Sequence, residues 1–176
     1  MKNSLVLILL LVMFSCVNNK PRRPIAPKPS TTIFSYTTKE LKKLNKVEDD
    51  KIKVLIENDS TRTYIKSQYG FWYTYEKQVN EELATPKESD VVEIKYNIKD
   101  LKDNLIYSEQ ELGLLTYKVD KEDFISGLQR GIKLMKTGET ITFVLPSYTA
   151  FGITGDGNKI GINTSIKSTV TLLNIK

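Results

Sequence analysis

The stretch FISGLQRGIKLMKTGETITFVLPSYTAFG, residues 124–152, decides the fold. Its first half carries apolar residues at three- and four-residue steps, namely Ile125, Leu128, Ile132 and Met135. This spacing is typical of a helix with one apolar face, and Gly138 is placed to end that helix. Residues 139–146 then alternate between apolar and polar side chains, as a strand does. The stretch therefore predicts a short helix followed directly by a strand.

The same stretch ends in a corner, VLPSYTAFG, residues 144–152. Pro146 has no backbone N–H and cannot continue a central strand, so we expect the strand to end there. Gly152 allows a backbone conformation that most residues avoid, which suits a tight turn. On these residues alone, the aromatic ring of Phe151 is interpreted as part of the core.

The segments on either side have the character of strands, because their side chains alternate in polarity or are aromatic and β-branched. They are FWYTY (71–75), VVEIKYNIK (91–99), LLTYKV (114–119) and STVTLLNIK (168–176). Only one helix is predicted to interrupt this part of the chain. The sequence therefore predicts an α+β fold in which an antiparallel sheet wraps around one short helix.

A helical segment is predicted upstream, over residues 37–60. Thr37 and Glu40 have the spacing of a capping box. The apolar residues that follow recur at near-helical intervals among many charged ones, and they are Leu41, Leu44, Ile52 and Leu55. This apolar stripe is thin. It suits packing on the main domain or on another protein, and the sequence does not choose between the two.

The N-terminus, MKNSLVLILLLVMFSC, has the pattern of an export signal over residues 1–15. A basic residue precedes an apolar run that is too short for a membrane-spanning helix of about 20 residues. The ending resembles a bacterial lipobox, which predicts lipid attachment at Cys16 and anchoring to a membrane of the bacterial envelope. The alternative is an ordinary cleaved signal with an incidental cysteine.

Residues 16–36 are rich in proline and basic side chains, and they predict an extended tether that contributes nothing to a core. Two functional alternatives are a proline-rich ligand and a basic patch that lies on anionic head groups. After Cys16 comes VNNKPRR, without the acidic cluster that marks some lipoproteins for surface display. We therefore expect an anchor that faces the periplasm.

Two absences and the distribution of charge limit the chemistry. The 176 residues contain no histidine and one cysteine, which excludes Ser-His-Asp and Cys-His catalysis, the common zinc sites and an intramolecular disulfide. No cofactor or metal is expected. The net charge is +5, but the basic residues are mixed with Asp and Glu along the chain, so nucleic-acid binding is not expected.

Residues 70–176 resemble the FKBP-type peptidyl-prolyl cis-trans isomerase domain. The resemblance rests on residues 124–152, preceded by DVVEIKY and followed by STVTLLNIK. The order of elements, the helix start, the Gly-Glu after the helix and the Pro-x-x-x-Ala-aromatic-Gly corner all agree in register. The whole chain is further similar to the gliding-motility-associated FKBP-type lipoproteins of gliding bacteria. This implies an FKBP-like fold and an isomerase or folding helper whose partners are proline-containing segments of envelope or motility proteins.

The resemblance also implies a pocket and assigns residues to it. Tyr96, Ile125 and Phe151 match catalytic positions, with Phe151 in the pocket wall. The backbone of Phe124 and Ile125 matches a pair that binds a ligand carbonyl. Positions that match substrate-binding residues are Ile106, Tyr107, Leu115, Tyr117, Phe124, Leu128, Ile160 and Ser168. Rotation of a prolyl amide transfers no proton, so the lack of histidine does not count against this reaction.

The chain departs from the family's pattern at four of these positions. Phe151 lacks the hydroxyl of the usual tyrosine, and Tyr107 replaces an aspartate. Leu128 and Ser168 stand where aromatic side chains are common, which predicts a wider or differently shaped cavity. We therefore expect an isomerase of low or atypical activity. The alternatives are a non-catalytic binding module and a structural lipoprotein of a motility or secretion complex.

Overall fold

The structure is a computed structural model that describes residues 31–176, with side chains from residue 37 onward. The predicted export signal, Cys16 and most of the predicted tether lie outside the described residues. The helices are α2 (Thr31–Asn58), α3 (Glu109–Leu112), α4 (Ser126–Ile132) and the 3-10 turn η1 (Ser147–Thr149). The strands are β1 (Ile65–Lys66), β2 (Trp72–Lys77), β3 (Val91–Tyr96), β4 (Ile98–Lys99), β5 (Leu105–Tyr107), β6 (Leu115–Lys118), β7 (Thr140–Leu145) and β8 (Ile166–Ile175). Residues 39–176 form one compact unit.

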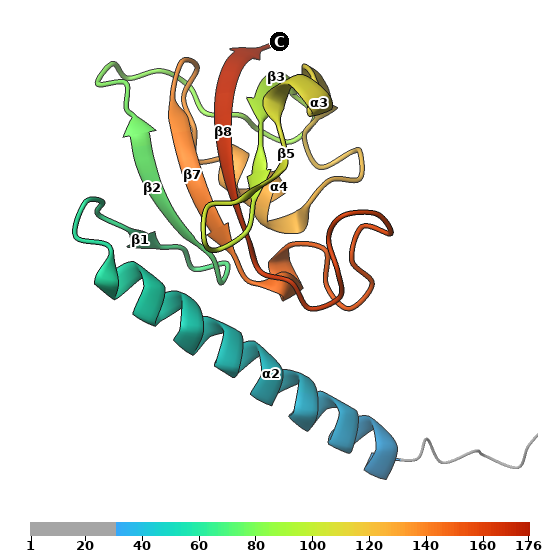
Figure 1. Ribbon diagram of the computed structural model, residues 1–176. Helices are drawn as coiled ribbons and strands as arrows, with labels where there is room; N and C mark the ends of the chain where they lie inside the picture. The colour runs from blue at the N-terminus through green and yellow to red at the C-terminus, as the bar shows by residue number, and fades with distance from the viewer. Residues whose placement is uncertain (1–30) are drawn as a thin grey trace, which may run out of the picture. The chain divides into compact units, whose positions relative to one another are not determined.

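The strands of the described residues form one antiparallel sheet. Six lie in the order β1-β2-β7-β8-β3-β6, and the short β4 pairs with β5 and β8. The long strand β8 lies between β7 and β3 and pairs with both (Figure 1). The predicted α+β fold with an antiparallel sheet is confirmed.

The predicted strand over residues 91–99 is divided in two, because Asn97 leaves the regular ladder. The backbone N–H of Asn97 donates to the carbonyl of Thr169 (3.1 Å), and its side-chain Oδ1 accepts the N–H of Thr169 (3.2 Å). A side chain thus takes the place of a backbone acceptor, and β4 begins at the next residue. The other predicted strands form within a few residues of their expected bounds.

The predicted helix of residues 125–135 forms as α4 but is shorter, ending at Ile132. Beyond it the N–H groups of Leu134 and Met135 donate to carbonyls three residues back, which tightens the turn. Gly138 does not end the helix directly. It stands in the turn into β7 with φ +88°, and its N–H donates to the carbonyl of Leu172 (2.8 Å).

Two glycines let α4 lie unusually close to strand β7. A Cβ at Gly127 would meet Leu145 Cδ2 at 2.7 Å, and one at Gly131 would meet Phe143 Cε1 at 2.5 Å. Real Cβ atoms do not approach other atoms so closely, so only glycine fits either position. Glycine weakens a helix by about 1 kcal/mol relative to alanine, and here the close packing of the helix on the sheet requires it.

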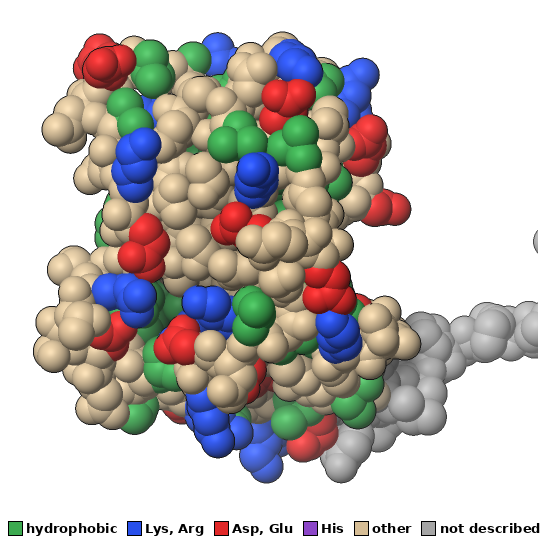
Figure 2. Space-filling model, turned by 45° about the horizontal axis from the view of Figure 1, so that its top comes forward, with side chains coloured by type: hydrophobic (Ala, Val, Ile, Leu, Met, Phe, Trp, Pro, Cys, Tyr) green, Lys and Arg blue, Asp and Glu red, His purple; other side chains and the backbone are tan. Residues whose placement is uncertain are grey.

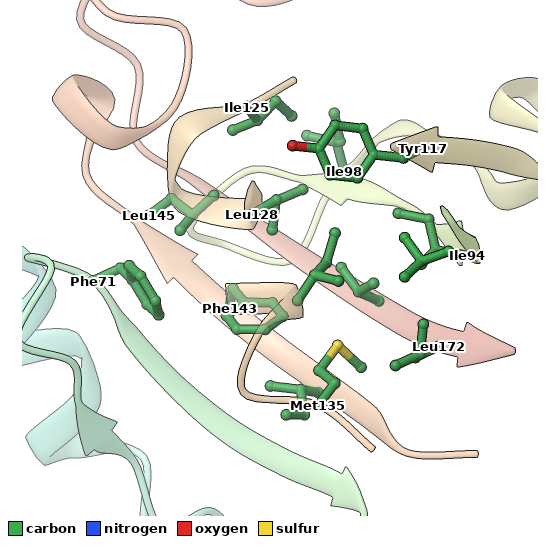
Figure 3. Close-up of a cluster of buried hydrophobic side chains, with 14 of the residues drawn as sticks. Phe71, Ile94, Ile98, Tyr117, Ile125, Leu128, Met135, Phe143, Leu145 and Leu172 are labelled. Carbon is green, nitrogen blue, oxygen red and sulfur yellow. The ribbon is translucent and has the colours of Figure 1, made fainter. Parts of the chain in front are cut away.

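The core fills the space between α4 and the sheet (Figure 3). Leu128 and Ile132 of α4 are completely buried, as are Phe143 and Leu145 on β7. Phe71 packs edge-on against Phe143, with ring centroids 5.8 Å apart. Burying side chains of this size contributes about 1.5–3 kcal/mol each, so this cluster is the main source of stability.

A one-turn helix, α3, was not predicted. The side chain of Ser108 caps it by accepting the backbone N–H of Glu111 (3.1 Å), and Gly113 ends it with φ +70°. The spacing of Ser108 and Glu111 is that of a capping box, which is the signal from which the helix could have been predicted.

Helix α2 begins at Thr31, six residues before the predicted start, so the end of the predicted tether is helical. The reason is that the prolines stop at Pro29, and nothing after it prevents a helix. Ile52 of α2 is completely buried, and Glu48 hydrogen-bonds to Ser147. Of the two alternatives left open by the sequence, α2 thus packs on the main domain.

Replacing Gly131 by alanine is expected to destabilise the protein, although alanine is the better helix former. The new methyl group would overlap the ring of Phe143, and overpacking of this kind costs about 1–3 kcal/mol. The control is Gly161→Ala, because a Cβ there meets only Thr164 Oγ1, at 3.6 Å. Thermal or urea unfolding of both variants measures the effect. Equal stability of Gly131→Ala and the natural chain would contradict the close packing of α4.

Candidate active site

A pocket of about 360 Å³ opens where β3, the start of α4 and the corner after β7 meet. Its lining residues are Tyr96, Asp123, Phe124, Ile125, Ala150 and Phe151. Five of the six are apolar or aromatic, and Asp123 is the one charged side chain among them. An apolar, concave site with a few polar groups is the usual form of a binding site for a small or extended ligand.

The aromatic walls of the pocket are fixed by packing against one another. Tyr96, the last residue of β3, meets Phe124 edge to face, with ring centroids 5.5 Å apart and an interplanar angle of 89°. Phe124 in turn contacts the buried ring of Tyr117 on β6 (5.4 Å). This geometry is the favoured one for aromatic pairs and holds both pocket rings in place.

Ile125 lines the pocket and is the residue that precedes helix α4. Its carbonyl accepts the N–H of Gln129 (2.9 Å), as expected of a residue that precedes a helix. Within the described part of the chain, its own N–H donates no hydrogen bond. Since Ile125 lines the pocket, this donor is available to a ligand carbonyl.

The opposite wall comes from the corner after β7. Pro146 follows the last residue of the strand, and η1 then leads to Ala150 and Phe151. Gly152 has φ +61°, in the region that favours glycine, and its N–H donates to the carbonyl of Ser147 (2.8 Å). The predicted strand end at Pro146 and turn at Gly152 are confirmed, and the turn sets Phe151 into the pocket wall rather than the core.

The corner and the start of α4 are tied directly to each other. The hydroxyl of Ser126, the first residue of α4, donates to the carbonyl of Thr149 (3.1 Å). A Cβ at Gly127 would also lie 2.9 Å from that carbonyl oxygen. The two sides of the pocket are therefore held at a fixed separation by one hydrogen bond and one close contact.

Tyr107 lies outside the pocket lining and holds the loop that follows Phe151. Its hydroxyl donates to Asp156 Oδ2 and accepts from Asn158 Nδ2 (3.1 Å). Asp156 Oδ1 accepts the backbone N–H groups of Asn158 (2.9 Å) and Ile160 (2.8 Å). The ammonium of Lys159 lies 4.5 Å from the centre of the Tyr107 ring. Tyr107 thus organises the loop around a carboxylate that the loop itself supplies.

These contacts change the pKa values of both partners. The hydrogen bond to Asp156 raises the pKa of the Tyr107 hydroxyl above its usual value. Burial opposes the charge on Asp156, but the hydrogen bonds from Tyr107, Asn158 and Ile160 outweigh it and lower the pKa of that carboxyl. Burial also raises the pKa of Tyr96. All three groups therefore keep one protonation state around neutral pH.

The structure brings four of the predicted site residues together in the pocket: Tyr96, Phe124, Ile125 and Phe151. The others do not line it. Ile106, Tyr107 and Leu115 are partly buried and pack around the core. Tyr117, Leu128, Ile160 and Ser168 are almost completely buried, with exposed fractions of 2%, 0%, 3% and 0%.

For these four buried residues the structure shows packing rather than contact with the pocket. Tyr117 accepts the backbone N–H of Asp120 (3.1 Å), and Ser168 donates to the carbonyl of Asn97 (2.7 Å). Leu128 belongs to the core under α4. Leu128 and Ser168 are both fully buried, and neither lines the pocket.

Two pocket residues were missed from the sequence. Ala150 stands inside the corner pattern of residues 146–152, so its neighbour Phe151 could have indicated it. Asp123 carries no such signal, because a carboxylate before an apolar run is usually solvated. It is exposed at the edge of the pocket.

The described residues contain no group of three or more acidic, histidine or cysteine side chains that could hold a metal ion. Among the described helices, none has both the length and the apolar character needed to cross a membrane. On the face shown in Figure 2, Lys and Arg side chains are interspersed with Asp and Glu. That face presents no continuous surface of one charge.

The sequence profile of the FKBP-type peptidyl-prolyl cis-trans isomerases matches residues 83–173, about half of the chain. The chain belongs to the FKBP-type peptidyl-prolyl cis-trans isomerase family. The match includes every residue that lines the pocket. It begins later than residue 70, where the sequence resemblance was expected to start.

A solved structure supports the fold independently. The 1.6 Å crystal structure of a peptidyl-prolyl cis-trans isomerase from Pseudomonas syringae pv. tomato superposes with a TM-score of 0.60. The two sequences are 18% identical, and the superposition covers 77% of this chain and 95% of that one. A comparison with curated proteins gave no significant match. The FKBP-like fold is confirmed.

Replacing Tyr107 by phenylalanine is expected to raise the pKa of Asp156 toward its usual value, because one hydrogen bond to the carboxylate is lost. A carboxyl with a lowered pKa contributes stability above its usual pKa of about 3.9, and that contribution is lost as the pH falls through the lowered value. In Tyr107→Phe this contribution should be smaller, and its loss should be complete at a higher pH. A carbon-13 NMR titration of the carboxyl groups measures it.

Asp100 is the internal control for this titration. Its pKa is lowered chiefly by the side chain of Asn104, which the substitution does not touch. The Asp100 titration should therefore be the same in both proteins. If the pKa of Asp156 also stays unchanged, Tyr107 does not hold the loop in the way described here.

Proposed function

We propose that the protein is a membrane-anchored FKBP-type peptidyl-prolyl cis-trans isomerase that acts on X-Pro segments of envelope proteins. One observation carries the proposal. The pocket joins the rings of Tyr96, Phe124 and Phe151 to the backbone N–H of Ile125, which is without an acceptor in the described residues. A proline ring and the carbonyl before it need this combination of an apolar wall and one donor.

The chemistry requires a change of environment rather than a proton transfer. Rotation about the prolyl C–N bond breaks amide resonance, against a barrier of about 18–20 kcal/mol. The twisted amide is less polar than the planar one, so an apolar pocket that excludes water favours it. The N–H of Ile125 would hold the substrate carbonyl while the aromatic walls hold the ring.

Tyr96 supplies a second donor in the same pocket. Among the described residues its hydroxyl has no hydrogen-bond partner, and its raised pKa keeps it protonated at neutral pH. A neutral hydroxyl can bind a carbonyl or the twisted amide without adding a charge to the site. The rate should therefore change little between about pH 6 and pH 8, because neither proposed donor, the Tyr96 hydroxyl nor the Ile125 N–H, changes its charge there.

The location and the clients rest on the sequence. The export signal and the lipobox that ends at Cys16 support an acyl anchor, and the absence of an acidic cluster after Cys16 supports a periplasm-facing protein. We infer envelope or motility proteins as clients from the sequence features that resemble the gliding-motility-associated FKBP-type lipoproteins. Uncatalysed X-Pro isomerisation takes tens to hundreds of seconds, which is slow enough to limit their folding.

A non-catalytic binding module is the second candidate, and one feature favours it. Tyr107 stands where the family carries an aspartate, and the nearby carboxylate of Asp156 is occupied by Tyr107 and two backbone N–H groups. A groove that keeps the pocket walls but has no carboxylate at the position of Tyr107 could bind an X-Pro segment without catalysing its isomerisation.

The deciding experiment measures prolyl isomerisation by the full chain, purified in detergent micelles, on short X-Pro peptides with varied residues before proline. The isomerase proposal predicts a rate that rises in proportion to the protein concentration and is flat around neutral pH. A chain that binds these peptides but never accelerates isomerisation would be the binding module instead.

Replacing Phe151 by alanine is expected to lower kcat/KM by one to two orders of magnitude, because the pocket loses its wall on the corner side. The loss of stability should be smaller, about 1–2 kcal/mol, since the ring is only partly buried. The peptide assay and thermal unfolding measure the two effects on the same sample.

Ile153→Ala is the matched control for Phe151→Ala. Ile153 is two residues further along the same loop, but 67% of it is exposed and it does not line the pocket. Its removal should leave the rate unchanged. A folded Phe151→Ala protein with full activity would contradict the assigned wall.

Replacing Cys16 by alanine is expected to move the protein from the membrane fraction to a soluble or unprocessed pool, because no acyl chain can be attached. Metabolic labelling with a fatty acid, followed by fractionation, measures the change, and immunoblots of total protein control for expression. Continued incorporation of label into the variant would show that the lipid is elsewhere.

A further inference from the structure

Glu48, in the middle of helix α2, ties the helix to the corner that carries the pocket wall. Its Oε2 accepts the backbone N–H of Ser147 (2.7 Å), and its Oε1 accepts the hydroxyl of the same serine (2.7 Å). Ser147 is 3% exposed, so these bonds are shielded from water. Hydrogen bonds to an ionised carboxylate are about twice as strong as neutral ones.

The same carboxylate also holds a second point on the chain. Ser165 donates its hydroxyl to Glu48 Oε2 (3.0 Å). Ser147 and Ser165 are the two ends of the segment that contains the corner, Phe151 and the loop organised by Asp156. One side chain of α2 therefore fixes both ends of this segment.

Backbone hydrogen bonds connect Ser147 to the pocket wall, and one of them comes from Ala150, whose N–H donates to the carbonyl of Ser147 (2.9 Å). Gly152, directly after Phe151, donates its N–H to the carbonyl of Ser147 (2.8 Å), and the carbonyl of Gly152 accepts the N–H of Asn163 (2.8 Å). A shift of Ser147 would thus move the backbone on which Phe151 stands.

Contacts of the residues next to Glu48 hold α2 in the position that lets Glu48 bind the corner. Ile52, one turn after Glu48, is completely buried. Asp49 Oδ1 accepts the hydroxyl of Tyr148 (2.8 Å), so two consecutive carboxylates of the helix bind two consecutive residues of the corner. If this face of α2 were only solvated, its two consecutive carboxylates would not bind two consecutive residues of the corner.

We propose that Glu48 is a positioning residue for the pocket, through which helix α2 sets the place of the Phe151 wall. The inference rests on the isomerase activity proposed above for its kinetic test. Under this proposal, α2 is required for full activity of the enzyme. The helix also connects the pocket to the part of the chain that leads to the proposed membrane anchor.

The test is Glu48→Gln in the full chain, with Glu57→Gln as the matched control on the same helix. The amide removes the negative charge, so the bonds from Ser147 and Ser165 lose the additional strength that an ionised acceptor gives them. Glu57 is exposed, and among the described residues its ion pair is with Lys53. We expect kcat/KM to fall about tenfold in Glu48→Gln and to stay unchanged in Glu57→Gln, at a temperature where both are folded.

Two further readouts separate positioning from a general loss of stability. Hydrogen exchange should speed up across residues 147–165 in Glu48→Gln and stay unchanged in β3 and β8. In the Phe151→Ala background, Glu48→Gln should add little further loss of activity, since the wall it positions is gone. Ser165→Ala, which removes only the outer bond, should show a weaker form of both effects.

Unchanged kinetics together with unchanged exchange in residues 147–165 would overturn the proposal. The proposal would also be overturned if Glu48→Gln lowered activity by the same factor with and without Phe151. Glu48 would then act on the enzyme by a route other than the Phe151 wall. If the natural chain shows no isomerase activity at all, the proposed function fails, and the exchange measurement alone decides whether Glu48 holds the corner.

Discussion

The close approach of helix α4 to strand β7 is the contact on which the rest of the structure depends. Gly127 and Gly131 leave no room for a methyl group between the helix and the residues it packs on, so the helix lies in close contact with the sheet. That close contact sets Ile125, at the helix start, opposite Phe151, at the end of the corner. The glycines weaken the helix by about 1 kcal/mol each, and burial of the apolar face of α4 offsets this. The pocket is a consequence of how the core packs.

Buried or half-buried carboxylates then fix the turns around that core. Glu139 is 1% exposed and accepts the backbone N–H groups of Val79 (3.1 Å) and Lys136 (2.8 Å). Asp156 does the same for the loop after Phe151, and Glu48 accepts the backbone N–H of Ser147 and the hydroxyl of Ser165 at the two ends of that segment. Each joins parts of the chain whose backbone donors would otherwise be left unpaired. This protein has no histidine and cannot form an intramolecular disulfide, and these carboxylates supply many of the contacts that order its loops.

The sequence predicted the parts of this structure that depend on local patterns. The alternation of the strands, the apolar face of α4, the stop at Pro146 and the turn at Gly152 all follow from residue spacing. What it missed depends on distant partners. A glutamate such as Glu48 looks like a solvated helix residue until the fold brings Ser147 to it. Leu128, which the resemblance assigns to substrate binding, is buried in the core. The pocket walls were predicted through the family resemblance, whereas the residues that hold the walls in place were not.

The central claim is that the apolar pocket between Tyr96, Phe124 and Phe151 lowers the barrier to prolyl rotation. The most direct test is two-dimensional exchange NMR on a labelled X-Pro peptide with a small fraction of the full chain in micelles. The account predicts exchange peaks between the cis and trans proline signals that the peptide alone does not show, together with shifts of the pocket aromatic rings. Shifts of those rings without any exchange between the two peptide forms would contradict it.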